Sequence, residues 1–144
     1  MNKTAEWVLR IAVAGEFLGH GIFAAATGYF KTAEAAAVAG YSLLFKKAWI
    51  GWMITATGVS AETATQMLLL IGLADIVVAV LMFVKPVRAA LLWAAVWGLW
   101  TALVRPLIGG ESVLEFVERF ANWGAPLALL LLFGWPRSIR GWFR

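Results

Sequence analysis

The chain is 144 residues long; 62% of its residues are hydrophobic, only 14% are charged, and nine are tryptophan. Several apolar runs of about 20 residues, the length needed to cross a bilayer, exclude an ordinary soluble domain and indicate an integral membrane protein. The lack of cysteine excludes disulfides, thiolate metal sites and covalent c-type haem attachment. The formal charge of +4 does not indicate nucleic-acid binding, because basic residues beside membrane spans mainly set orientation.

Apolar segments predict four spanning helices, at about residues 7–30, 65–84, 87–107 and 120–135. The first is expected to remain as a span rather than to be cleaved as a leader, because Arg10 interrupts its apolar stretch. Between spans one and two, the apolar run at residues 48–54 is too short to cross and is interpreted as an interfacial or re-entrant element. The sequence therefore predicts an all-α, integral membrane four-helix bundle, with residues 1–144 forming a single transmembrane domain.

The basic residues indicate the orientation of the chain. Seven would share the side of the N-terminus: Lys3, Arg10, Lys85, Arg88, Arg137, Arg140 and Arg144. Five would lie on the other side, together with five glutamates: Lys31, Lys46, Lys47, Arg105 and Arg119. Because cytoplasmic loops carry an excess of Lys and Arg, this distribution predicts that both termini are cytoplasmic, in a bacterial inner membrane.

Small residues predict which helix faces pack together. Gly15 and Gly19 form a GxxxG pair in span one, and span three carries a stripe of small residues at a spacing of four: Ala90, Ala94, Gly98 and Ala102. Such stripes let helix backbones approach closely in lipid. A separate face of span three carries Trp93, Trp97 and Trp100, which we expect to contact lipid or a neighbouring subunit rather than a cofactor. Pro126 is expected to bend or restart the last helix.

Polar residues inside the apolar spans form the candidate site. Asp75 lies at the midpoint of span two, where a carboxylate costs about 2.5–3.5 kcal/mol to insert and is by default a functional-site hypothesis. Alternating helix direction would gather seven residues into a polar cluster that opens toward one membrane side: Glu16, His20, Asp75, Arg105, Glu118, Arg119 and Asn122. Arg105 and Arg119 are expected to neutralise the carboxylates of this cluster (Glu118, Glu16 or Asp75). The alternative interpretation is a network that only stabilises the bundle.

The residue types in this cluster limit its chemistry. His20 is the only histidine, and no ExxH or HxxxH spacing is present, so no metal site is predicted. Axial ligation of haem or a chlorophyll-type pigment by His20 remains an alternative. A quinone fits better, because its head group needs hydrogen-bond donors and titratable groups, which His20, Glu16, Asp75 and Arg105 could supply. Electrons would then come from a partner subunit.

Short motifs in the first two spans resemble the DoxX-like family of four-helix membrane proteins. They are Leu9-Arg10 followed by Gly15, Phe17 and His20-Gly21, and then Gly72-Leu73-Ala74-Asp75; the resemblance covers about residues 7–108. The chain departs from the family pattern in carrying Asp75 where Glu is commoner, and Phe23-Ala24 where a Lys is expected. The resemblance implies a compact four-helix bundle linked to quinone or thiol-redox membrane complexes.

Together these observations favour a small integral membrane subunit of a respiratory or related redox complex, with a quinone-adjacent or proton-relaying polar cluster. A stand-alone DoxX-like quinol oxidoreductase and a structural scaffold that contacts lipid, pigment or haem are the alternatives. The expected partners are the lipid bilayer and either a larger membrane protein complex or further copies of the chain, with no nucleic acid.

Overall fold

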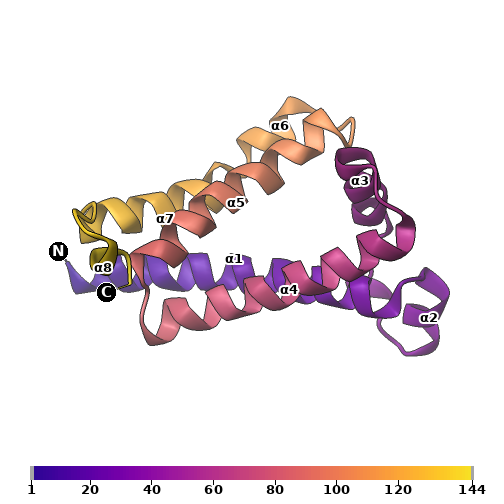
Figure 1. The fold of residues 1–144 in the computed structure, drawn as a ribbon, viewed down its shortest axis with the longest axis horizontal. Helices are drawn as coiled ribbons and strands as arrows, with labels where there is room; N and C mark the ends of the chain where they lie inside the picture. Colours follow the sequence, from indigo (N-terminus) through magenta and orange to yellow (C-terminus); the bar gives the residue numbers. More distant parts are fainter. Residues whose placement is uncertain (1, 144) are drawn as a thin grey trace. The chain divides into compact units, whose positions relative to one another are not determined.

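The computed structural model describes residues 2–143, and every regular element in that range is helical. The elements are α1 (Lys3–Phe30), α2 (Ala33–Val38), the 3-10 helix η1 (Ser42–Leu44), α3 (Lys47–Thr57), α4 (Ala61–Val84), α5 (Arg88–Leu107), α6 (Val113–Val117), α7 (Phe120–Phe133) and α8 (Ile139–Trp142) (Figure 1). Four helical stretches are long and apolar enough to cross a membrane: Lys3–Phe30, Ala61–Val84, Arg88–Leu107 and Val113–Phe133. The predicted all-α class and the four apolar helices are confirmed.

The last helical stretch differs from the prediction in where it is interrupted. The helix breaks at Glu118 and Arg119, between α6 and α7, whereas α7 runs through Pro126 without a break. Pro126 cannot donate a hydrogen bond to the carbonyl of Asn122, one turn earlier. That carbonyl lies against Gly98 of α5, where an added Cβ would come within 2.5 Å of it. The carbonyl that Pro126 leaves without its helical hydrogen bond is therefore packed against the backbone of α5.

The connection between α1 and α4 is a chain of short elements. Thr32 caps α2 by accepting a hydrogen bond from the backbone N–H of Ala35, and α3 ends at Gly58, whose φ of 72° is in the left-handed region. With 11 residues, α3 is too short to cross a bilayer, as predicted.

The described chain divides into two compact units, and α1 and α4 each continue from one unit into the other. Of the described residues, one unit comprises 2–16 and 78–143, and the other comprises 17–77. The single transmembrane domain predicted above stays a prediction.

In the first unit, α5 and α7 run side by side (Figure 1). The small-residue stripe of α5 is buried along its whole length, which confirms the predicted packing face: Ala90, Ala94, Gly98 and Ala102. Trp93 and Trp100 are exposed on another face, as expected, and Trp93 stacks on Trp97 with ring centroids 5.8 Å apart.

Two arginines in this unit bind the last carbonyls of helices. The Arg10 guanidinium donates to the carbonyls of Met82 and Phe83, at 2.7 and 2.6 Å, where α4 ends. The Arg88 guanidinium donates to the carbonyls of Phe133 and Gly134, at 2.6 and 2.9 Å, where α7 ends. Both arginines therefore satisfy backbone acceptors that a helix C-terminus leaves without an internal partner.

In the second unit, α1 and α4 meet along a seam of three glycines. A Cβ added at Gly28 would overlap the backbone of Thr65 and Leu69, and one added at Gly72 would overlap the backbone of Ala25. At Gly21 it would come within 2.8 Å of the carbonyl oxygen of Gly72. Only glycine allows the backbones of α1 and α4 to approach each other this closely.

The GxxxG pair singled out from the sequence does not form this seam. Among the described residues, nothing outside the helix's own backbone lies within 4 Å of a Cβ built at Gly15 or Gly19. The prediction of close packing at these two glycines is therefore wrong. The contact is made by glycines farther along α1, because those face the glycine of α4.

Candidate functional site

The glycine seam brings His20 of α1 and Asp75 of α4 into direct contact. The distance between His20 Nδ1 and a carboxylate oxygen of Asp75 is 2.6 Å. The Asp75 side chain is 1% exposed, whereas the His20 side chain is 23% exposed. A carboxylate that is hidden in this way requires a hydrogen-bonding partner, and the imidazole provides it.

The contact limits the roles of the two imidazole nitrogens. An ionised carboxylate only accepts hydrogen bonds, so with Asp75 ionised the hydrogen of this contact belongs to Nδ1 of His20. In that tautomer Nε2 accepts a hydrogen bond when the ring is neutral and donates one when the ring is an imidazolium.

Trp49 of α3 stacks on the imidazole of His20. The ring centroids are 4.7 Å apart and the planes differ by 27°. Phe23, one turn along α1, meets Trp49 edge-on with a centroid distance of 6.4 Å. The short helix α3 therefore places an aromatic side chain on the dyad formed by His20 and Asp75, instead of lying apart from α1.

The N-terminal end of α3 is tied to α1 by Lys46. Its ammonium lies 4.2 Å from the centre of the Phe23 ring, and its backbone N–H donates to the hydroxyl of the buried Thr27 at 2.9 Å. Cation–π attraction and the hydrogen bond hold the residue before α3 against α1, and this positions Trp49. The sequence analysis predicted only an interfacial or re-entrant element at residues 48–54; the contacts of Lys46 and Trp49 with α1 were not predicted.

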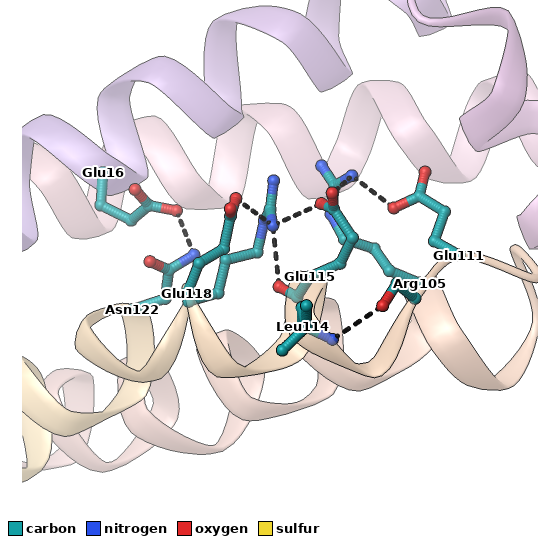
Figure 2. A network of polar contacts seen from close by, with 9 residues as sticks. Glu16, Arg105, Glu111, Leu114, Glu115, Glu118 and Asn122 are labelled. Atoms are coloured by element: carbon teal, nitrogen blue, oxygen red, sulfur yellow. Dashed lines mark hydrogen bonds and ion pairs between the residues drawn. The ribbon is translucent and has the colours of Figure 1, made fainter.

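The other five predicted site residues lie in the first unit, in a network of polar contacts (Figure 2). Arg105 pairs with Glu111 at 3.0 Å and with Glu115 at 3.8 Å. Arg119 pairs with Glu115 at 2.7 Å and with Glu118 at 2.5 Å. The expected neutralisation of Glu118 by Arg119 is confirmed, whereas the carboxylates found against Arg105 are Glu111 and Glu115, which the sequence analysis did not assign to it.

Glu16 extends this network to α1. Its carboxylate accepts a hydrogen bond from the side-chain amide of Asn122 at 2.7 Å, as Figure 2 shows. Glu16 and His20, both on α1, therefore have different hydrogen-bond partners: Asn122 for Glu16 and Asp75 for His20. An amide donor satisfies a carboxylate without adding charge.

The network around Arg105 and Arg119 is a chain of partly exposed ion pairs that joins the end of α5 to α6 and the start of α7. Exposed pairs of this kind contribute little each, about 0–1 kcal/mol, and mainly fix geometry. In the dyad the carboxylate is nearly completely buried, so of its two side chains only the partly exposed imidazole could meet a ligand. We therefore take the dyad and Trp49 as the candidate functional site.

Within residues 2–143, no three His, Cys, Asp or Glu side chains are grouped closely enough to hold a metal ion. The Nδ1 edge of the His20 imidazole is in contact with Asp75, and Trp49 stacks on a face of the same ring.

Comparison of the chain with known protein families, with curated proteins and with solved structures finds no match. The resemblance to the DoxX-like family stays a prediction.

Proposed function

We propose that the chain is an integral membrane protein in which the four long apolar helices cross the bilayer as a bundle. Large apolar side chains are exposed along these helices, including Leu70, Val77 and Val80 on α4. Contact between such a surface and water is unfavourable, whereas contact with lipid chains carries no such free-energy cost. The membrane proposed is a bacterial inner membrane, and the larger number of basic residues on the side of the N-terminus supports cytoplasmic termini.

We further propose that the dyad binds the head group of a quinone and transfers a proton to or from it. The observation that carries this proposal is the 2.6 Å contact between the partly exposed His20 and the buried Asp75. Nε2 would hydrogen-bond a quinone oxygen and take up one proton as a quinol hydroxyl is oxidised, while the contact with Asp75 holds the ring in place. The apolar helix surfaces suit an isoprenoid tail.

Oxidation of a quinol releases two electrons and two protons, so the dyad alone cannot complete it. The chain has no cysteine and one histidine, which leaves few ligands for a redox centre of its own. We propose that a partner subunit of a respiratory or related redox complex accepts the electrons and that the second proton leaves through water. In this account the chain is an accessory subunit; a stand-alone quinol oxidoreductase would need a bound flavin or another acceptor.

The test is quinone binding by the purified chain. Protein extracted in a mild detergent should bind a short-tailed ubiquinone or menaquinone analogue at one site. His20→Gln should weaken binding about tenfold, a loss within the range expected when one hydrogen bond is removed. The matched control, Glu118→Gln, changes an exposed carboxylate in the network around Arg119 and should bind like the wild type.

Circular dichroism and elution as a single species would establish that the variants are folded. Equal quinone binding by the folded His20→Gln variant, or none by the wild type, would contradict the proposed site. Co-purification of a cofactor-bearing subunit would separate the accessory role from the stand-alone enzyme.

A second candidate is axial ligation of haem or a chlorophyll-type pigment. Donation of one imidazole N–H to a carboxylate is typical of histidines that bind a metal through the other nitrogen, and His20 has this arrangement. The absorption spectrum of the same preparation decides between the two. A Soret or chlorin band that disappears in His20→Gln would favour the pigment, whereas bound quinone without such a band favours the first proposal.

A further inference from the structure

A basic and aromatic surface lies at the end of the first unit where α4 and α7 end and α5 begins. Residues 134–143 follow directly on α7, Lys85 follows α4, and α8 packs against α5, which begins at Arg88. These residues therefore lie immediately beyond apolar stretches that are long enough to cross a membrane. In a bilayer this position corresponds to the headgroup layer, so the inference rests on membrane insertion and not on quinone binding.

The segment at residues 134–143 has a fixed fold. Arg88 donates to the carbonyl of Gly141 at 3.3 Å, in addition to its bonds at the end of α7. The hydroxyl of Ser138 accepts from the backbone N–H of Gly141 at 3.3 Å, and Trp135 meets Trp142 edge-on at 5.2 Å. The backbone is thus folded back on α5, and the side chains that it carries are displayed in a defined arrangement.

The side chains on this surface are basic and apolar, with no acidic residue among them. Lys85, Arg137 and Arg140 are exposed, and no described carboxylate lies within ion-pair distance of them. Ile139 is 82% exposed. The sequence has no Asp or Glu at residues 76–110 or 119–144. The carboxylate of Glu6, which lies near the end of α4, is paired with Arg10 and not with these three residues.

We propose that this surface binds the head groups of anionic phospholipids. Arg137, Arg140 and Lys85 would contact the lipid phosphates, while Trp135, Ile139 and Phe143 enter the boundary between headgroups and acyl chains. Arginine is suited to phosphate because its planar guanidinium can donate two parallel hydrogen bonds. Tryptophan prefers the same depth. The charge of the surface selects an anionic over a zwitterionic lipid, and its exposed apolar side chains select a lipid over free phosphate.

The test compares lipids on the full chain in mild detergent. Fluorescent phosphatidylglycerol should bind more tightly than the matched phosphatidylcholine, and added salt should weaken its binding. Each basic residue near an anionic surface contributes roughly a fivefold gain, so Arg137→Gln/Arg140→Gln should weaken phosphatidylglycerol binding roughly 10- to 30-fold. The control Lys31→Gln/Lys47→Gln removes the same charge from residues 31–64 and should bind like the wild type.

Several outcomes would overturn the proposal. They are equal binding of the two lipids, equal loss in the control and in the test variant, and displacement of phosphatidylglycerol by inorganic phosphate at matched concentration. Resistance of the chain to alkaline carbonate extraction from membranes, measured in parallel, tests insertion separately. Failure of lipid selectivity with insertion intact therefore refutes this surface and leaves the proposed quinone site untouched.

Discussion

The contact between His20 and Asp75 predicts a measurable energetic coupling between α1 and α4. The perturbation is a double-mutant cycle with Asp75→Asn, His20→Gln and the combined variant. Hydrogen bonds to charged groups contribute about 1.5–3 kcal/mol, whereas hydrogen bonds between membrane helices average about 0.6 and reach about 1.7 kcal/mol. A 2.6 Å contact to a carboxylate that is 1% exposed belongs at the upper end of the membrane range, so we expect a coupling of about 1.5 kcal/mol.

The assay is unfolding in mixed micelles with increasing dodecyl sulfate, followed by circular dichroism. The matched cycle on Glu118 and Arg119, whose contact is more exposed, should give a coupling of about 0.5 kcal/mol or less. If the two substitutions at the dyad are additive to within about 0.5 kcal/mol, the reasoning is refuted, because independent sites behave in that way.

Three further predictions concern packing and access. Gly72→Ala should destabilise the chain by about 1–3 kcal/mol, because the added Cβ would overlap backbone that cannot move aside. Gly15→Ala should be nearly neutral, since nothing among the described residues outside the helix's own backbone lies near a Cβ at that position. Unfolding in mixed micelles compares the two variants, and equal effects would rule out the glycine seam. Arg10→Gln should lose about 1–3 kcal/mol and increase amide hydrogen exchange at the end of α4, since its guanidinium holds the last carbonyls there; unchanged exchange would contradict this capping role. Trp49→Ala should raise the rate at which diethyl pyrocarbonate modifies His20, the only histidine, several-fold; an unchanged rate would show that stacking does not shield the ring.

The sequence predicted the helices because their signal is local. Runs of about 20 apolar residues predict spans whatever they pack against, and a run of seven predicts a segment that cannot cross. Pro126 was expected to bend or restart the last helix because proline is a strong local breaker signal. The helix does not restart there: α7 continues through Pro126, and the interruption is at Glu118 and Arg119.

The contacts of the site were predictable only in part. Asp75 in the middle of an apolar span indicated that it is buried and needs a partner, and His20 was among the candidates. The choice between His20 and Arg105 depends on which glycines form the seam, and Gly15 and Gly19 carry a more familiar motif than Gly21 and Gly72 do. No periodicity signal links Trp49 to His20, because their contact depends on how the short connection between two long helices folds back.

The most direct test of the central claim is the nitrogen-15 spectrum of the His20 imidazole, which is the only one in the chain. In wild-type protein the account predicts that Nδ1 carries a proton in a strong hydrogen bond and that a short-tailed quinone analogue shifts the Nε2 resonance. Asp75→Asn should change the Nδ1 resonance. An Nε2 resonance that does not respond to saturating quinone, or an Nδ1 resonance that is unaffected by Asp75→Asn, would contradict the account.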